Sequence, residues 1–426
     1  MLSRPFLRLL LLSVLLGVPI SLAAFFFVSL QHWLQHEVWE ALPRALGHDR
    51  PPWWWPLPAL ALAGLILAPI VTRMPGRGGH LPVGGLNHTP THPRDLPGVA
   101  LAALLTLPLG VVLGPEAPLM AVGSALALLA LRAVRRDADE RVTTVVATTG
   151  STAAISTILG GPLAAAVMVV EAAGLATPQL TVLLLPCLAA SAAGALVFTG
   201  FGQWTGLSIG ALSLPTVPPD VRPDAGDFLW GLPIAVLVTV IVAGARGLGE
   251  HTRRWTAGRA TAWRTVACAV AVGAALSAYA LVTGRSPAEA ALSGQITLGQ
   301  LAAQPHAWSV GALVALVLCK GLAYGLALGS MRGGPIFPAV LLGAATAMAC
   351  SGLPSLGVTP ALALGVVAAT TAVTGLPLTS SVLTVLLLGK DAHDQMPLIV
   401  ICAVVAFVTS RFLERRTAGR AEGAGR

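Results

Sequence analysis

One glutamate stands between two prolines in the segment GPEAPLMAVG, residues 114–123, where two long apolar stretches meet. If these stretches cross a bilayer, a carboxylate there costs about 2.5–3.5 kcal/mol on insertion scales, so it needs a compensating partner or a function. The first amides of a helix supply such a partner, because they lack intrahelical acceptors and carry about half a positive charge. Since proline is tolerated just inside a helix start, the segment predicts a helix that begins near Glu116 and could hold an anion.

The same pattern recurs in the second half of the chain. GPEAPLMAVG and GPIFPAVLLG (334–343) share Gly-Pro-x-x-Pro-x4-Gly, with Pro118 and Pro338 lying 220 positions apart. Short segments interrupted by Gly and Pro at matching places in two halves indicate a transport site formed by broken helices. A single motif of this kind is equally compatible with a kink or a close helix crossing.

A second correspondence follows in the same order. GGPLAAAVMVV (160–170) and TGLPLTSSVLTV (374–385) share Pro-Leu followed by small and apolar residues, and Pro162 and Pro377 are 215 positions apart. Two correspondences at nearly one offset indicate a duplicated unit of about half the chain.

The composition is that of an integral membrane protein. The 426 residues are 55% hydrophobic and 10% charged, with a mean hydropathy of +0.80, and apolar runs approach the roughly 20 residues that a membrane helix needs. The 46 Gly and 32 Pro, without period-two alternation, favour close-packed, interrupted helices over a barrel. These runs lie near 6–30, 53–72, 95–113, 116–131, 142–173, 180–200, 228–245, 265–283, 307–329, 335–350, 357–389 and 397–409. The predicted fold class is therefore all-α.

The formal net charge of +8 comes almost wholly from arginine. The loop from 37 to 50 is nearly balanced, so the positive-inside rule places both termini in the cytoplasm, with the chain crossing the cell inner membrane or plasma membrane many times. No interleaving of basic and aromatic residues suggests nucleic acid, and the charged tail after Phe412 is expected to be disordered. The main clusters are Arg4/Arg8, Arg132/Arg135/Arg136/Arg141, Arg246/Arg253/Arg254/Arg259/Arg264 and Arg411/Arg415/Arg416/Arg420.

The N-terminal 24 residues have the basic start and apolar middle of a secretion signal, but apolar character continues beyond them, so an uncleaved first membrane helix is favoured. The cysteines show neither CxxC nor His spacing, so we expect packing roles, no disulfide framework and no metal site. They are Cys187, Cys268, Cys319, Cys350 and Cys402.

These motifs resemble the CLC family of chloride channels and proton/chloride exchangers, from about residue 6 to 410. LGPEAPLMAVG is similar to the family's G-(K/R)-E-G-P segment, RGGPIFPAVLLG to its G-x-F-x-P segment, and GRGGHLP (76–82) to its G-S-G-I-P segment. The stretches 139–171 and 370–391 are similar to the helix-loop-helix units that follow these segments.

The resemblance implies a homodimer whose subunits each carry an anion pathway, built from two inverted repeats of tilted and broken helices. The corresponding division is 1–200, 201–410 and a short cytoplasmic tail, 411–426. Helix starts near Gly78 to His80, Pro115 to Glu116 and Pro335 to Phe337 are expected to converge, with chloride or a similar small anion as the partner and no cofactor. Glu116 alone matches the gating carboxylate. Its other interpretation is a capping glutamate that faces an aqueous vestibule. The residues expected to bind the anion are Gly79, His80, Pro115, Ala117, Ile336 and Phe337.

The chain also departs from the family pattern. Pro115 and Ala117 replace the usual basic residue and glycine, the serine that contacts the central anion falls on Gly79, and Ile336 takes the phenylalanine position, with Phe337 next. The C-terminal tyrosine has no counterpart, so the anion must be held by backbone amides, water or other side chains. His80 could replace a ligand or sense pH, since imidazole changes charge near neutrality, or it could be a loop histidine near the surface.

A second carboxylate decides between passive conduction and exchange. The internal proton-transfer glutamate of the exchangers falls on Ala172, directly after Glu171, and one position on a helix rotates a side chain by about 100°. Glu171 therefore supplies an altered proton pathway, or it is a helix-end residue near water and coupling is absent. We favour a passive chloride channel, with a proton-coupled chloride antiporter as the alternative.

Lys320 is another isolated charge in an apolar run. It either supports the fold or the electric field along the anion pathway, or its side chain extends to a water-filled vestibule. A membrane-embedded enzyme would need a nucleophile with a nearby base or a motif such as HExxH, and the sequence shows neither, so no enzyme activity is expected. A cation transporter would need several acids at mid-membrane, but few besides Glu116 and Glu171 lie in apolar segments.

Overall fold

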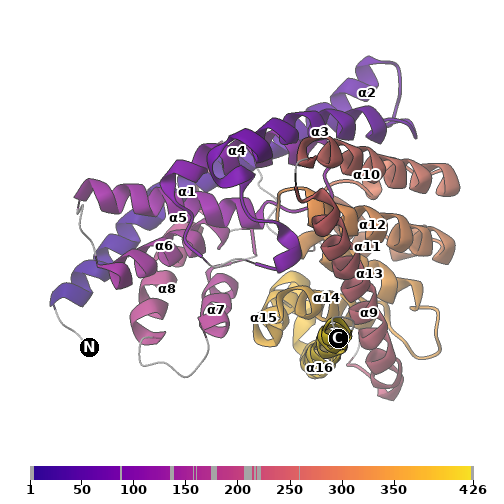
Figure 1. Ribbon diagram of the computed structural model, residues 1–426. Coiled ribbons are helices and arrows are strands. Elements are labelled where there is room, and N and C mark those ends of the chain that lie inside the picture. The colour runs from indigo at the N-terminus through magenta and orange to yellow at the C-terminus, as the bar shows by residue number, and fades with distance from the viewer. Residues whose placement is uncertain are drawn as a thin grey trace.

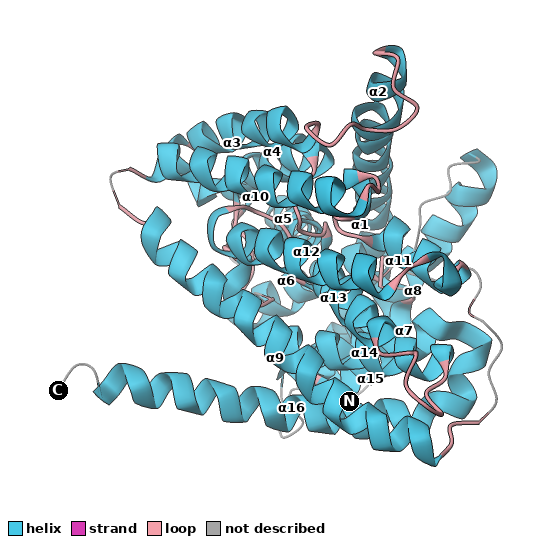
Figure 2. Ribbon diagram, turned by 90° about the vertical axis from the view of Figure 1, so that its right-hand side faces the viewer, coloured by secondary structure: helices cyan, strands magenta, loops and turns pink. Residues whose placement is uncertain are grey.

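Most helices of the two halves of the chain lie on opposite sides of the molecule, but α3 (Pro56–Arg73) of the first half packs along α10 (Thr261–Thr283) of the second (Figure 1). The computed structural model describes residues 4–423 apart from 87–88, 135–138, 157, 160, 174–179, 206–213, 215–216, 218–221 and 259. Arg135, Arg136, Arg259 and Gly160, which the sequence predictions used, lie outside the described residues. Within them, regular structure is helical (Figure 2), and Gly114 and Gly334 form an isolated antiparallel bridge.

Sixteen α-helices are described, and they divide between the halves. The first half contains α1 (Arg4–His36), α2 (Leu42–Ala45), α3 (Pro56–Arg73), α4 (Leu96–Thr106), α5 (Glu116–Val134), α6 (Glu140–Ile155), α7 (Pro162–Ala173) and α8 (Leu180–Thr205). The second half contains α9 (Ala225–Thr256), α10 (Thr261–Thr283), α11 (Gln295–Ala303), α12 (Val310–Ser330), α13 (Ile336–Ala349), α14 (Val358–Thr374), α15 (Pro377–Leu388) and α16 (Ala392–Gly423).

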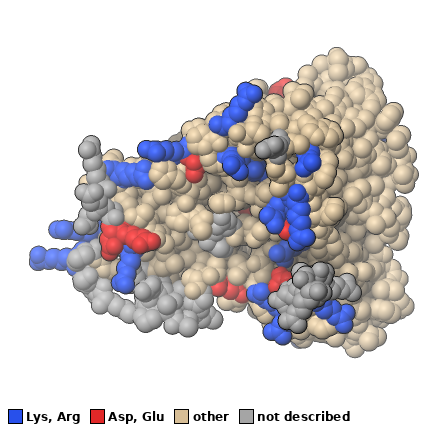
Figure 3. Space-filling model, in the orientation of Figure 1, with Lys and Arg blue, Asp and Glu red and all other residues tan. Residues whose placement is uncertain are grey.

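Eight described helical segments are long and apolar enough to cross a membrane. Exposed leucines on such helices, among them Leu65, Leu196 and Leu318, suit contact with lipid tails. Most of the surface seen in Figure 3 is uncharged, and basic groups cover more of that face than acidic ones. The prediction of an all-α, multi-pass membrane protein is confirmed. The eight segments are Phe6–Ala45, Pro56–Arg73, Glu116–Val134, Leu183–Thr205, Ala225–Thr256, Thr261–Thr283, Val310–Ser330 and Pro377–Arg416.

Two helix crossings repeat between the halves. α5 meets α6 where Gly123 faces Gly150, and α13 meets α14 where Gly343 faces Gly365, so that a Cβ atom on any of these glycines would collide with the opposing backbone. The glycines are 220 and 215 positions apart, the same offsets as the proline motifs. Small residues let membrane helices approach this closely. The crossings support two repeats, although the boundaries 1–200 and 201–410 remain a prediction.

The predicted helix start at Gly78 to His80 is wrong. The chain forms a tight turn with non-helical backbone angles at Pro75–Gly78 and a single 3₁₀ turn at Pro82–Gly84. Gly76, Arg77, Gly78 and Gly79 have φ angles of 67°, 48°, 74° and 100°. Four successive positive φ angles cannot belong to a right-handed helix.

The predictions for two polar segments are also wrong. The described part of the segment after Phe412 is helical and not disordered, because α16 continues to Gly423. An Arg411–Glu414 ion pair one turn apart and the helix-forming Ala, Glu and Arg residues favour this helix. The expected loop from residue 37 begins as a π-helical turn, Glu37–Ala41, that runs into α2.

The five cysteines are free, as expected for packing residues. Cys187, Cys268 and Cys402 are buried, and Cys319 and Cys350 are half-buried.

Candidate functional site

Glu116 is the first residue of α5, as the proline pattern predicts. The carbonyl of Pro115 accepts the Leu119 N–H at 2.9 Å and so closes the first turn. Immediately before it, Gly114 and Gly334 exchange two backbone hydrogen bonds of 2.8 and 2.6 Å. This bridge brings the starts of α5 and α13 together from the two halves of the chain.

The Glu116 carboxylate lies on the start of α13. Its Oε1 accepts the Ile336 N–H at 2.6 Å and the Phe337 N–H at 3.4 Å, and the residue is 1% exposed. A Cβ atom at Gly114 or Gly334 would collide with the carboxylate, so two glycines form its cradle. A carboxylate from one half of the chain therefore takes the N-terminal position of a helix in the other.

The two carboxylate oxygens are not equally satisfied. Oε2 is buried and has no hydrogen-bond partner among the described residues. An unsatisfied buried polar atom costs about 1–3 kcal/mol, whereas a partly buried helix N-terminus stabilises an anion by up to about 2 kcal/mol. Glu116 is thus held, but not strongly, and another anion could compete for the same amides.

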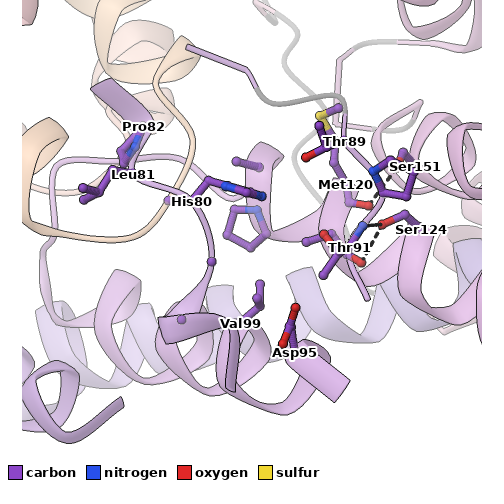
Figure 4. Close-up of a pocket in the computed structure, with 18 of the residues that line it drawn as sticks. His80, Leu81, Pro82, Thr89, Thr91, Asp95, Val99, Met120, Ser124 and Ser151 are labelled. Carbon is purple, nitrogen blue, oxygen red and sulfur yellow. Dashed lines mark hydrogen bonds between the residues drawn. The ribbon is translucent and has the colours of Figure 1, made fainter. Parts of the chain in front are cut away.

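A cavity of about 270 Å³ lies next to Glu116 and is lined by Gly79, His80, Ala117 and Gly333 among others. That volume has room for several water molecules or a hydrated anion. His80 is exposed, and Figure 4 shows it between Leu81 and Pro82 on one side and the polar residues of the other wall.

The other wall is built from hydroxyl groups fixed by hydrogen bonds. Ser124 Oγ accepts the Thr91 N–H at 3.2 Å and donates to Ala121 O at 3.1 Å, and Ser151 Oγ donates to Met120 O at 2.9 Å (Figure 4). Sequence reasoning did not anticipate these serines, because nothing in the motifs indicates that the middle of α5 and the second half of α6 face one space.

The predicted site residues thus fall into two adjoining groups. Glu116, Ile336 and Phe337 meet at the start of α13, and Pro115 precedes Glu116 on the same turn. The cavity brings together the remaining three, Gly79, His80 and Ala117.

Glu171 lies elsewhere, where α7 meets α15, which are neighbours in Figure 1. Its carboxylate accepts the Leu378 N–H at 2.8 Å, the Thr379 N–H at 2.6 Å and the Thr379 hydroxyl at 2.7 Å. Glu171 thus caps the start of α15, as Glu116 caps that of α13, but it is partly exposed.

Lys320 is fully buried and does not reach a vestibule. Its Nζ donates to the carbonyls of Ala290, Ala291 and Leu292 at 2.8, 3.2 and 3.1 Å. Three acceptors satisfy its three donors, so the interpretation that Lys320 supports the fold is favoured.

Tyr324 is a residue that sequence reasoning missed. Its buried hydroxyl donates to Pro335 O at 2.7 Å and braces the start of α13 from α12. The available signal was a polar aromatic residue inside an apolar helix, where a tyrosine hydroxyl needs a partner.

Residues 76–411 match the profile of a family described as voltage gated chloride channel. A stretch of 173 residues is 32% identical to the putative ion-transport protein YfeO of Salmonella paratyphi A, and the match covers 39% of this chain and 40% of that protein. The corresponding protein of Salmonella newport gives the same values. The chain thus spans about 40% of the length of the curated relatives it matches.

Solved structures resemble the fold over nearly its whole length. A CLC-type fluoride/proton antiporter superposes with a TM-score of 0.75 at 19% identity, covering 96% of this chain and 97% of that one. A slow cyanobacterial Cl⁻/H⁺ antiporter superposes with a TM-score of 0.73 at 16% identity, covering 95% of each chain. This likeness confirms the CLC-like fold, and together with the profile match over most of the sequence it shows that the chain belongs to the voltage-gated chloride channel (CLC) family.

Proposed function

We propose that the protein transports small anions, chloride above all, across a membrane, along a path that the Glu116 carboxylate closes. The observation that carries the proposal is the 2.6 Å hydrogen bond from the Ile336 N–H, at the start of a buried helix, to a carboxylate from the other half of the chain. Amides that hold a carboxylate can also hold chloride, since both are anions at a helix N-terminus. Membership of a channel family favours transport over the enzyme and cation-transporter alternatives.

Gating follows from competition for these amides. Protonation removes the negative charge that the start of α13 attracts, and an anion arriving from the cavity beside Ala117 competes for the same donors. In either case the side chain leaves and the path opens. The backbone segment at Gly79 and His80, together with Pro115 and Ala117, lines the approach to the start of α13.

We favour passive conduction over exchange. The oxygens of Glu171 accept three hydrogen bonds at the start of α15, which suits a structural cap. Proton-coupled chloride antiport is the second candidate, because Glu171 is partly exposed and also joins the two halves of the chain.

We further propose that the protein works as a homodimer in a cell inner membrane or plasma membrane, with both termini in the cytoplasm. The dimer is what the family resemblance implies, and the orientation follows from the arginine clusters that flank the apolar runs.

The test is the reversal potential of purified protein in liposomes under opposed chloride and pH gradients. Passive conduction predicts a potential set by chloride alone. A shift with the pH gradient refutes passive conduction and supports antiport, in which case Glu171→Gln should remove the shift. Absence of chloride, nitrate and fluoride flux from folded protein refutes anion transport.

The role of His80 needs its own measurement. If His80 binds the anion or senses pH, His80→Ala changes chloride flux or its pH profile between about pH 5 and about pH 8. An unchanged profile leaves His80 as a loop residue at the cavity.

A further inference from the structure

A second cavity, of about 540 Å³, adjoins the 76–82 segment and is lined there by Arg77 and Leu81. The ends of α3 and α9, the start of α10 and the link between α12 and α13 line it, and it is open to the outside. Its described lining contains three arginines, Arg77, Arg253 and Arg332, and no acidic residue. We call it the arginine cavity.

Arg332 is the most buried of the three, with 9% exposed. Its Nε donates to Arg77 O at 3.0 Å and its Nη1 to Met331 O at 3.2 Å, while its Nη2 has no hydrogen-bond partner among the described residues. Burial and the nearby Arg77 lower the pKa of Arg332 to about 10, so it remains charged at neutral pH. Nη2 is not sealed from solvent, so its two hydrogens can be donated to a ligand in the cavity.

Arg253 adds a second cation that is not fully neutralised. Its Nε and Nη2 donate to Glu250 at 2.7 and 2.5 Å, but Arg254 Nε also donates to Glu250, at 3.2 Å. One carboxylate is therefore shared by two guanidinium groups, and Nη1 of Arg253 has no partner in the described chain. The region keeps an excess of positive charge.

Four of the five hydroxyl groups of the cavity already donate to backbone carbonyls, and only Thr265 has no such acceptor among the described residues. Thr256 donates to Arg253 O or Gly329 O at 3.2 Å, and Ser330 donates to Leu326 O at 2.7 Å. Recognition therefore falls mainly to the guanidinium groups, with the Thr265 hydroxyl as a further donor, and their planar forks match oxyanions such as phosphate better than a spherical halide.

The surroundings of the cavity suit the surface of a membrane. Trp255 lies in the last turn of α9 and Trp263 in the first turn of α10; their ring centroids are 6.3 Å apart, and they are 41% and 64% exposed. Arg264 lies 5.5 Å from the centroid of the Trp255 ring. Exposed tryptophans beside arginines are typical of the boundary between lipid and water, and basic pockets between membrane helices suit phosphate headgroups.

We propose that the arginine cavity binds a phosphate group. A phosphate there accepts hydrogen bonds from Arg332 and Arg253 and fixes Arg332, whose Nε holds the carbonyl of Arg77. Because Arg77 precedes Gly78–Gly79 and Arg332 precedes the Gly334 bridge, an occupied cavity stiffens both segments that flank the candidate anion path. The predicted effect of phosphate on anion flux rests on the proposed function, whereas the predicted binding of phosphate in the arginine cavity does not.

The test compares Arg253→Gln with Arg254→Gln. Both variants remove a guanidinium bound to Glu250 on α9, but only Arg253 lines the cavity. Native mass spectrometry of the full chain in detergent measures retention of phosphatidylglycerol against phosphatidylcholine. We expect wild type and Arg254→Gln to prefer phosphatidylglycerol, and Arg253→Gln to lose about tenfold in affinity for it, as expected for about 1.4 kcal/mol. An equal loss in both variants, or no lipid preference in wild type, overturns a phosphatidylglycerol site.

Inorganic phosphate identifies the source of the group. If phosphate at constant ionic strength raises the melting temperature of wild type and Arg254→Gln but not of Arg253→Gln, the site takes the free ion as well. If only the lipid binds, the source is a headgroup. If neither binds, the proposal is wrong.

Flux in phosphatidylcholine vesicles with and without phosphatidylglycerol gives the last comparison. The lipid should change chloride flux in wild type and Arg254→Gln and leave Arg253→Gln unaffected. An equal response of all three overturns the coupling to the path. If none of the three proteins transports anions, the transport proposal is wrong, but the result on phosphate binding is unaffected.

Discussion

Replacing Glu116 by Gln tests the gate most directly, because the amide keeps the shape of the carboxylate and removes its charge. In the structure Oε1 accepts the Ile336 N–H at 2.6 Å, and Oε2 is buried without a partner. Glutamine would retain the first bond as a neutral one and would place an NH₂ group, which needs an acceptor, where Oε2 lies.

The structure gives the size of the effect. A charge-assisted hydrogen bond is about twice as strong as a neutral one, so its loss removes about 1 kcal/mol. The helix N-terminus no longer attracts a charge, which removes about 1–2 kcal/mol more. If the side chain binds these amides about 2–3 kcal/mol more weakly, the equilibrium between bound side chain and bound anion shifts about 30- to 150-fold towards the anion. We expect flux to rise by at least about tenfold, since other steps then limit it.

The assay is chloride efflux from liposomes, with a potassium ionophore to balance charge, from acidic to neutral pH. Chloride efflux through the wild-type protein should become faster as the pH falls, because protonation removes the charge with which Glu116 competes against chloride. Glu116→Gln should be fast at every pH. Glu40→Gln is the matched control, since Glu40 is half exposed and pairs with His36 and Arg44. If folded Glu116→Gln keeps the wild-type rate and pH profile, Glu116 is a cap and not the gate.

Three further substitutions test the supports of the site. Lys320→Met leaves three buried carbonyls without a donor and should cost about 3 kcal/mol in chemical unfolding, whereas Lys390→Met, at an exposed residue, should not change stability. Tyr324→Phe removes the hydrogen bond to the residue before α13 and should cost about 1 kcal/mol in the same assay, and an unchanged midpoint contradicts the bracing role. Gly334→Ala places a methyl group against the carboxylate, so it should raise chloride flux in wild type but have no further effect in Glu116→Ala; an equal effect in both backgrounds shows that the methyl group acts elsewhere.

The sequence predicted the helices whose starts are marked by proline. Both Gly-Pro-x-x-Pro motifs mark α-helices, which begin at Glu116 and Ile336, because a fixed φ angle and a missing N–H suit the first turn of a helix whatever surrounds it. The same local chemistry failed at residues 76–82. The glycines in this segment can adopt either right-handed helical or left-handed backbone angles. Packing against α4 selects the left-handed angles, because Gly98 of α4 lies against the Pro75 carbonyl.

The candidate site was predicted in part for a similar reason. Glu116 stands out in sequence because an acid in an apolar run is conspicuous by itself. Ile336 and Phe337 were predicted to lie at the same anion site as Glu116. The sequence did not predict that their N–H groups donate to the Glu116 carboxylate, which is 220 positions away in the chain. Arg332 was missed because its motif was interpreted through its glycines and prolines, and its contact with Arg77 O depends on tertiary structure alone.

The placement of the site depends on contacts between the halves of the chain. Two hydrogen bonds at the Gly114–Gly334 bridge set the position of the Glu116 carboxylate relative to the start of α13, and the bond from Arg332 to Arg77 O sets the 76–82 segment relative to both. Each donor and its acceptor come from different halves, so a small shift between the halves changes all of these distances at once while every helix stays intact. In the proposed mechanism an anion displaces Glu116 from amides that belong to the other half, so the same interface sets both how tightly the anion binds and how easily the path opens.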